Sequence, residues 1–519
     1  MSHPISELSQ WADLNGATFH NIAPATAGQN RGSGLIATQD LNSNSQNGPL
    51  MIVPRDLVLS KETVELLSKS DKDLRSLLEA LGDFVHTPRG AILTFLLYLR
   101  TMNTARSATP AIHLGTLSPF NQYVEFLPQE LLPTFWNEDE IAFLRGTSLS
   151  AALTAKLKSL LREFSILSER TQDISWCQSF WHAPPTTSPF SPLELDDWKI
   201  VDSMYRSRAL EFPGIGDAMV PCIDIANHAS GSSTSALYEI DGEGNAVLLL
   251  REGVRVGEEE EVTITYGDLK GACEMLFSYG FIEDTMEDAR ELFLPLDMNE
   301  DDPLGPAKKH ISKEVFAPGV KIYRHHEGKD KNENENENEN EEGKEKQEGK
   351  SSVNWHSEFL YLSILNQEDG LDFAVAQTTT GERILQMLWK GEHIPSLALS
   401  SFVDEVLKRD EYWELFHLRA TVTVLERVRE QMGILDSVDP EILREEGGIE
   451  VRERCYDLAV RLRELEGRLM SEAVGELEKE IEELSETEVV RRWFEMHAAG
   501  GDEVELEQGV REQDDEDFT

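Results

Sequence analysis

The chain has 519 residues, enough for two or three domains, and a hydrophobic content of 40% that is adequate for packed cores. Its 96 acidic and 48 basic residues give a formal net charge of −48, which argues against binding to a nucleic-acid backbone, because that requires a basic face. An acidic surface suits a basic protein partner, or it serves only to keep the protein soluble.

The cysteines and the apolar segments indicate a reducing intracellular compartment. Cys177, Cys222, Cys273 and Cys455 form no Cys-x-x-Cys pair, so neither a zinc site nor a disulfide framework is expected. The N-terminus lacks the basic and apolar regions of a secretory signal. The most apolar run, residues 91–99, is far shorter than the roughly 20 residues that span a bilayer. We therefore expect a cytosolic or nuclear protein without a membrane segment.

The chain begins with strand signals. Apolar segments 31–37 and 50–53 flank a polar loop, residues 42–48, and predict a β-hairpin or meander. The pattern Gly32-x-Gly34-x-x-Ala37 formally matches a dinucleotide-binding fingerprint. That fingerprint needs a helix directly after it to hold the pyrophosphate, whereas a loop and another strand follow here. The dinucleotide interpretation is therefore rejected.

Helical patterns dominate from about residue 61 to residue 210. Apolar spacing predicts a buried helix over 87–100, and Asn137 followed by three acids predicts the start of another. A further helix is expected around 195–210. Strands return at 236–240 and 246–250, and the Asp- and Gly-rich residues between them predict a hairpin turn.

The remainder of the chain has a helical and acidic pattern after about residue 285. The Asn-Glu repeats within 327–350 leave no apolar side chain to bury and predict a disordered insertion. A leucine stripe between 458 and 484 predicts an amphipathic helix that packs against its neighbours. The acidic tail, 502–519, is expected to fray.

Residues 214–281 carry the strongest functional signal. An apolar segment ends in Asn227-His228, an acidic turn at 257–261 leads into a strand ending in Tyr266-Gly267, and the region closes on Tyr279-Gly280-Phe281. This succession resembles the C-terminal half of a SET domain. The acidic turn is interpreted as solvated, with neither a metal nor a general-base carboxylate.

Further motifs appear in the order of one SET subfamily, the RuBisCO large-subunit lysine methyltransferase and its ribosomal-protein and actin-directed relatives. They are Gly32-Ser33-Gly34-Leu35, Ile52-Val53-Pro54, Leu57-Val58-Leu59-Ser60, Ser118-Pro119-Phe120, and Ser207-Arg208-Ala209-Leu210, in which Leu210 replaces a family Phe. The resemblance covers most of residues 15–500.

The resemblance implies an α+β fold: a mainly-β SET core split by a helical insert and followed by an all-α substrate-binding domain. The implied division places the N-terminal half of the core at 1–90, the insert at 91–199 and the C-terminal half at 200–284. The helical domain is expected at 285–500, with the insertion 327–350 inside it, and the acidic tail at 501–519.

The resemblance also implies site residues. Tyr266 matches the family's active-site tyrosine, and Tyr279 matches a second aromatic of the lysine channel. The other positions match contacts to the cofactor S-adenosylmethionine (AdoMet); they are Arg31, Gly32, Ser33, Arg208, Asn227, His228, Tyr266 and Phe281. Among these, Arg208 is expected to pair with the cofactor carboxylate and Phe281 to pack on adenine, while Arg31 stands where several relatives carry Glu. No metal is implied.

The expected function is AdoMet-dependent methylation of a lysine in a non-histone protein, such as a ribosomal or other translation-related protein, by a monomer. A target lysine must lose its proton before it can attack, because an ammonium has no lone pair, and an apolar channel lowers its pKa. A histidine target is an alternative, since one branch of the subfamily methylates actin histidine. Another alternative is a catalytically weak SET module that recognises a protein segment.

Overall fold

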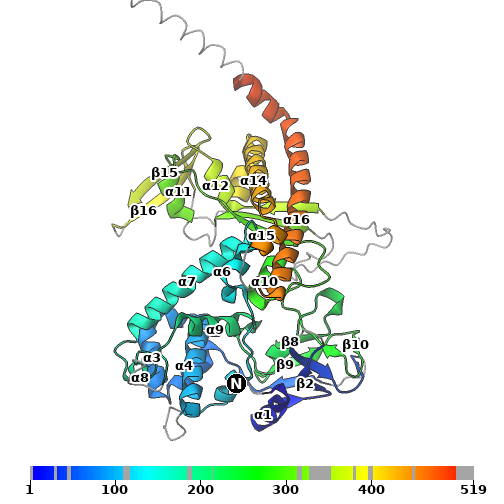
Figure 1. Cartoon of the computed structure of the whole chain (residues 1–519). Coiled ribbons are helices and arrows are strands. Elements are labelled where there is room, and N and C mark those ends of the chain that lie inside the picture. Colours follow the sequence, from blue (N-terminus) through cyan, green and yellow to red (C-terminus); the bar gives the residue numbers. More distant parts are fainter. Residues whose placement is uncertain are drawn as a thin grey trace, which may run out of the picture. The chain divides into compact units, whose positions relative to one another are not determined.

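The computed structural model describes most of the chain, shown in Figure 1. The described residues are 4–28, 32–43, 48–108, 117–183, 190–212, 214–312, 318–325, 352–377, 381–394, 401–446 and 451–497. The predicted insertion at 327–350 and the tail at 501–519 lie outside them. The chain divides into two compact units, of which the first comprises Met1–Asn137, Ala152–Lys270 and Glu274–Phe281, and the second comprises Glu138–Ala151, Gly271–Cys273 and Ile282–Thr519. The finer predicted division into four domains and a tail stays a prediction.

The described strands of the first unit form small antiparallel sheets. One sheet has the order β1-β5-β9-β8, another β11-β3-β2, and two pairs are β10-β4 and β6-β7. Their bounds are β1 (Thr18–Phe19), β2 (Ile22–Thr26), β3 (Ser33–Ala37), β4 (Leu41–Asn42), β5 (Met51–Val53), β6 (Leu210–Phe212), β7 (Gly216–Ala218), β8 (Ala236–Ile240), β9 (Ala246–Leu250), β10 (Arg255–Val256) and β11 (Glu261–Val262).

The structure confirms one predicted hairpin and corrects another. Strands β8 and β9 pair directly, with Ala236 opposite Leu250, as the turn residues between them predict. By contrast, β3 and β5 do not pair with each other. Strand β3 pairs with β2 and β11, whereas β5 pairs with β1 and β9. The prediction of a hairpin or meander from these two segments was wrong because partners distant in sequence, which no local pattern reveals, complete both sheets.

The first unit contains several helices, most of which lie to one side of its strands (Figure 1). They are α1 (Leu8–Leu14), α2 (Lys61–Ser68), α3 (Lys72–Leu81), α4 (Pro88–Ala108), α5 (Phe120–Phe126), α8 (Ser175–Phe180), α9 (Leu195–Arg206) and most of α7 (Ser148–Arg170) and α10 (Ala272–Tyr279). Helices α4 and α9 confirm the helices predicted over 87–100 and around 195–210. Residues 91–99 of α4 are all buried, which explains why they form the most apolar run of the sequence.

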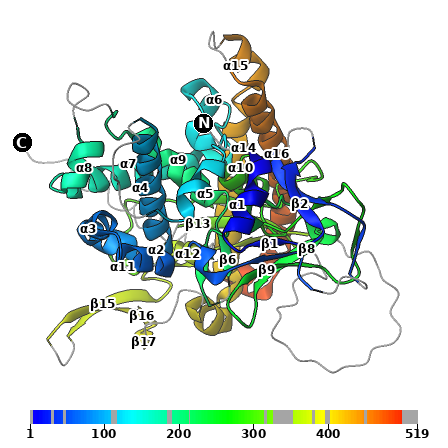
Figure 2. The same cartoon turned by 90° about the horizontal axis from the view of Figure 1, so that it is seen from below.

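The second unit contains both helices and strands. Its helices are α6 (Glu138–Ala142), α11 (Gly305–Ile311), α12 (Glu358–Ile364), α14 (Trp413–Asp436), α15 (Pro440–Glu446) and α16 (Glu453–Ser485). Its strands are β12 (Glu291–Pro295), β13 (Gly319–His325), β14 (Ser352–His356), β15 (Leu371–Gln377), β16 (Arg383–Trp389) and β17 (Glu392–Ile394). They pair in the orders β12-β13-β14 and β15-β16-β17, and Figure 2 shows the long β15–β16 hairpin.

The mixed α and β fold class is confirmed. The C-terminal region is helical in character, as predicted, but it also contains strands and is therefore not all-α. In β12 the buried Leu292 and Leu294 alternate with the exposed Phe293, a period of two that marks a strand with one buried face. This short alternating pattern is outweighed in the sequence by the longer helical stripes around it. The predicted leucine stripe is confirmed, since Leu462, Leu465 and Leu469 of α16 are fully buried.

Helix α7 is held at its beginning by a buried carboxylate from α16. Glu466 accepts hydrogen bonds from the Ser148 backbone nitrogen at 2.8 Å and from the Ser148 hydroxyl at 2.5 Å. The first backbone N–H groups of a helix lack partners within the helix, so this carboxylate acts as its cap. Burial raises the pKa of Glu466 to about 7, although the Ser148 hydrogen bonds and Arg463 oppose the shift.

We expect Glu466 to make stability depend on pH. Because its folded pKa of about 7 exceeds the ordinary value of 4.5, the folded protein holds this proton over a range in which the unfolded chain has released it. Its contribution to stability is therefore present at low pH and lost as pH rises from about 4.5 to about 7. In thermal unfolding across this range, the Tm of Glu466→Gln should fall less than that of the wild type. Parallel Tm curves would contradict this assignment.

No helix in the described part of the chain combines the length and the apolar character needed to cross a membrane.

Candidate active site

A strained turn sets the direction of the segment that ends in Asn227-His228. Cys222 is fully buried and has a φ of 74°, a left-handed conformation that is costly for a residue other than glycine. A short 3₁₀ turn, Ile223–Ile225, follows, after which the chain becomes extended at Ala226. The packing of the surrounding core holds this backbone in place.

The extended segment then runs alongside the segment that carries Tyr266, in which regular strand structure is confined to β11 and, contrary to the prediction, does not extend to Tyr266-Gly267. His228 forms a parallel bridge with Ile264. The Ile264 nitrogen donates to the Asn227 oxygen, and the Ala229 nitrogen donates to the Ile264 oxygen, both at 3.0 Å. Two motifs that lie far apart in the sequence, Asn-His and Tyr-Gly, are thereby placed side by side.

Tyr266 is held by hydrogen bonds from both its backbone nitrogen and its hydroxyl. Its backbone nitrogen donates to His228 Nδ1 at 2.9 Å, and its hydroxyl donates to the Ala226 carbonyl at 2.9 Å. Burial raises the pKa of Tyr266 well above its ordinary value, against the opposing effect of the Arg208 cation. The hydroxyl therefore stays protonated at neutral pH, and its proton points to Ala226.

Aromatic rings from three segments gather around Tyr266. Its ring centroid lies 4.5 Å from that of Tyr279 and 5.2 Å from that of His228, with interplanar angles of 30° and 29°. Phe281 lies 6.5 Å from Tyr266 and 6.2 Å from His228. Burial raises the pKa of Tyr279 to about 12. The structure thus brings together four of the predicted site residues, Tyr266, Tyr279, His228 and Phe281, as one aromatic cluster.

Asn227 joins this cluster to the N-terminal strands. Its side-chain amide donates to the Ser33 carbonyl at 3.1 Å and to Glu261 Oε1 at 2.6 Å. A Cβ at Gly34 would lie 2.7 Å from that Glu261 oxygen and 3.0 Å from Asn227 Nδ2, so a larger residue would displace the Glu261 carboxylate from this amide. Gly32 has a φ of 70°, which also favours glycine.

The interpretation of the acidic turn as solvated needs one correction. Residues 258–260 are exposed, but Glu261 is half-buried and bonds to Asn227. No local pattern indicates this contact, because it depends on the pairing of β11 with β3. Arg31, the remaining N-terminal site residue, lies outside the described residues.

Arg208 contacts two acidic residues, Asp224 and Glu130, that the sequence motifs did not indicate. It donates to the Asp224 backbone oxygen at 2.7 Å and to Glu130 Oε1 at 2.9 Å. The Asp224 carboxylate accepts from the Tyr123 hydroxyl at 2.5 Å, and burial raises the pKa of Asp224 to about 6 although Arg208 opposes the shift. Asp224, an acid between two isoleucines, could have been recognised as a buried charge, whereas Glu130 carried no such signal.

One guanidinium nitrogen of Arg208 makes no hydrogen bond to the described residues. Its Nε atom is buried and has no hydrogen-bond partner among the described residues. Most buried polar atoms are hydrogen-bonded, and an exception at a candidate site is consistent with a group that binds there.

Comparisons with known proteins match this region and the whole fold. A family model described as cytochrome c lysine N-methyltransferase 1 matches residues 212–298, which include the Asn-His, Tyr-Gly and Tyr-Gly-Phe motifs. The chain is 27% identical over 389 residues to SET domain-containing protein 8 of Schizosaccharomyces pombe, covering 74% of this chain and 76% of that protein.

Two other curated relatives are matched over half of their length or less. The chain is 28% identical over 204 residues to the chloroplastic [fructose-bisphosphate aldolase]-lysine N-methyltransferase of Arabidopsis thaliana, covering 38% of this chain and 40% of that protein. It is 23% identical over 330 residues to the actin-histidine N-methyltransferase of Gallus gallus, covering 62% and 49%.

Solved structures match nearly the entire chain. The SET domain of LSMT bound to MeLysine and AdoHcy has a TM-score of 0.59 at 19% identity and covers 98% of this chain and 100% of the other. Rubisco LSMT bound to AdoMet has a TM-score of 0.55 at 18% identity, with coverage of 95% and 96%. The SET-domain fold expected from the sequence, and the resemblance to SET-domain methyltransferases, are confirmed.

Proposed function

We propose that this chain, which has a SET-domain fold and protein methyltransferases among its relatives, is an AdoMet-dependent protein-lysine N-methyltransferase. The observation that carries the proposal is the parallel pairing of the His228 segment with the segment that leads to Tyr266, with the rings of Tyr279 and Phe281 packed around Tyr266. This arrangement joins polar backbone groups to a cluster of aromatic rings. Methyl transfer to an amine needs both the polar groups, which orient the reactants, and the aromatic rings, which exclude water.

The residues around the paired His228 and Tyr266 segments fit AdoMet. Asn227 fixes its segment to Ser33, Gly32-Ser33 offer backbone groups, and Phe281 offers an aromatic face for adenine. The buried Arg208 Nε lacks a partner among the described residues, and a cofactor carboxylate would supply one. Bound there, AdoMet would supply an electrophilic methyl group. The assignments of Arg31, Gly32, Ser33, Arg208, Asn227, His228, Tyr266 and Phe281 to the cofactor remain part of this proposal.

The protein's task is to present a neutral amine in the correct direction. A lysine in water has a pKa near 10.4, so at neutral pH it is almost entirely protonated and cannot attack. The rings of Tyr266 and Tyr279 exclude water and lower that pKa. Since the Tyr266 proton is engaged with the Ala226 carbonyl, its oxygen is left to accept a hydrogen bond from an amine N–H. This contact orients the amine without adding a charge, and orientation is the larger part of such catalysis.

The lysine target is favoured by the matched family model and the aldolase-directed relative, both named for lysine methylation. Histidine is the second candidate, because the chain also matches an actin-histidine N-methyltransferase over 62% of its length. We further propose that the substrate is a non-histone protein, with ribosomal and translation-related proteins the first to test. Mass spectrometry of the methylated peptide separates the two target residues.

Calorimetry of AdoMet binding tests the proposal directly. We expect the wild type to bind AdoMet, and Asn227→Ala to bind it about tenfold or more weakly, because the variant loses the amide that ties the segment to Ser33 and Glu261. Asn245→Ala, in the turn between β8 and β9, is the matched control and should bind as the wild type does. If a well-folded wild type fails to bind AdoMet, the enzyme proposal falls and a protein-recognition module becomes the leading hypothesis.

A further inference from the structure

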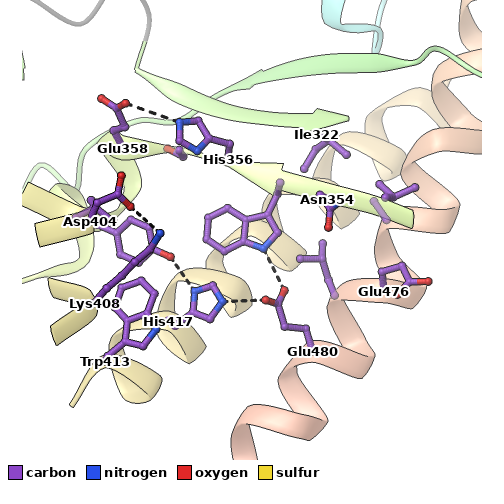
Figure 3. A pocket seen from close by; sticks show the side chains of 17 residues that line it. Ile322, Asn354, His356, Glu358, Asp404, Lys408, Trp413, His417, Glu476 and Glu480 are labelled. Atoms are coloured by element: carbon purple, nitrogen blue, oxygen red, sulfur yellow. Dashed lines mark hydrogen bonds and ion pairs between the residues drawn. The ribbon is translucent and has the colours of Figure 1, made fainter. Parts of the chain in front are cut away.

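The second unit contains a pocket of its own, with a cavity volume of about 420 Å³. It is lined by β13, β14, the beginning of α12, the short helical segment Phe402–Val406 with its following residues, α14 and α16. All of these elements lie in the second unit. Figure 3 shows its side chains: Glu476 and Glu480 stand on one side, and Glu358 and Asp404 stand on the other.

Aromatic rings form one wall of this pocket. Trp413 and His417 lie one helical turn apart on α14, with ring centroids 5.1 Å apart and an interplanar angle of 13°. His417 also stacks on Trp355 of β14 at 5.6 Å and 23°, and Tyr361 of α12 stacks on Trp413 at 5.4 Å and 29°. Nearly parallel rings from three elements thus present a continuous wall.

Hydrogen bonds fix these rings to a carboxylate. Tyr361 and His417 share a hydrogen bond of 2.8 Å between the phenol oxygen and Nδ1, and His417 Nε2 lies 2.9 Å from Glu480 Oε1. The Trp355 indole donates to Glu480 Oε2 at 3.1 Å. Burial raises the pKa of Glu480, but these two hydrogen bonds outweigh that effect and hold it below its ordinary value. Glu480 is therefore an anion set at the edge of the aromatic wall.

The rim of the pocket is negative as well. Glu358, Asp404 and Glu476 line it together with Glu480, and the one lysine in the lining, Lys408, is ion-paired with Asp404 at 2.6 Å. Glu476 is exposed and makes no ion pair among those seen in the described residues. An anionic ligand would be repelled here, and an apolar ligand would leave the exposed Glu476 carboxylate without a counter-ion.

We propose that this pocket binds an arginine- or lysine-bearing basic segment of the substrate protein. The proposal rests on the proposed function, because it supplies the substrate class for that activity. A cationic head can lie on the aromatic wall while it pairs with the carboxylates. Arginine suits the pocket best, since its planar guanidinium stacks on rings and binds carboxylates through two nitrogens. The net charge of −48 attracts the same kind of partner over longer distances.

The test is calorimetric binding of a short peptide of alternating glycine and arginine to the full chain, with a glycine–glutamate peptide for comparison. We expect binding of the arginine peptide only, and about a fivefold loss of affinity in the double variant Glu476→Gln/Asp404→Asn, because it removes two carboxylates and leaves the Lys408 cation in the pocket without its partner. Both side chains are exposed, so the variant should fold. Glu482→Gln, an exposed residue of α16 outside the pocket lining, is the matched control and should bind as the wild type does.

AdoMet titrations on the same samples separate this inference from the proposed function. Unchanged AdoMet binding together with a selective loss of peptide affinity in the double variant supports the pocket. Equal peptide affinity in the double variant and the Glu482→Gln control overturns it, as does equal binding of the glutamate peptide. If AdoMet fails to bind while the arginine peptide binds through these carboxylates, the enzyme proposal fails and the pocket stands as a recognition site for basic segments.

Discussion

Tyr266→Phe should lower the rate of methyl transfer by about a hundredfold or more while leaving AdoMet affinity nearly unchanged. The hydroxyl is held by the Ala226 carbonyl, so its oxygen is positioned to accept a hydrogen bond from the target amine. Phenylalanine keeps the ring that stacks on Tyr279 and His228 and removes only this acceptor. Transfer of label from AdoMet to proteins of a cell extract measures the rate, and calorimetry measures the affinity.

Tyr98→Phe provides the matched control for this experiment. The Tyr98 hydroxyl is buried and donates to Asp71 at 3.0 Å, in the part of the core where α4 packs against the beginning of α3. Its removal should cost about 1 kcal/mol of stability and leave the transfer rate unchanged. Full activity in Tyr266→Phe would refute the catalytic assignment. An equal loss in both variants would point to a general effect on folding.

Arg463→Met should lower the free energy of unfolding by about 3–5 kcal/mol. The side chain is only 7% exposed, and its guanidinium donates to the backbone oxygens of Phe143, Arg145, Leu435 and Val438. Methionine fills a similar volume, but it leaves these acceptors unsatisfied and removes the cation that faces the buried Glu466. Urea unfolding followed by circular dichroism measures the change.

Arg468→Met, one turn further along α16, makes the same chemical change at the surface. Arg468 is exposed and donates to the Glu287 carbonyl at 3.0 Å. Its substitution should shift stability by no more than about 0.5 kcal/mol. If the two variants unfold at the same urea concentration, Arg463 does not have the structural role assigned to it.

Much of the local structure could be predicted from the sequence because it rests on short-range signals. The turn between β8 and β9, the buried helix α4 and the leucine stripe of α16 each follow from the spacing of a few neighbouring residues. The motifs at Asn227-His228, Tyr266 and Tyr279 indicate the SET-domain fold through their residue types and their order along the chain. Their roles in catalysis and cofactor binding stay predictions until the binding and activity measurements are made.

The strands of the second unit were not predicted. Strand β12 is short, and its alternation between Leu292 and Leu294 spans too few residues to stand out beside the helical segments around it. Its register follows from its pairing with β13, in which Leu294 opposes Val320. Such pairing is a tertiary outcome rather than a local preference.

By itself, the sequence determined the class of the fold, the order of its motifs and the identity of the residues in the paired His228 and Tyr266 segments, because these depend on local spacing and side-chain chemistry. Only the tertiary structure decided which distant groups meet. It placed Glu130 against Arg208, Glu261 against Asn227, and Trp355 of β14 beside His417 of α14. These contacts join residues separated by tens of positions, and they form only when packing of the whole unit brings the chain segments together.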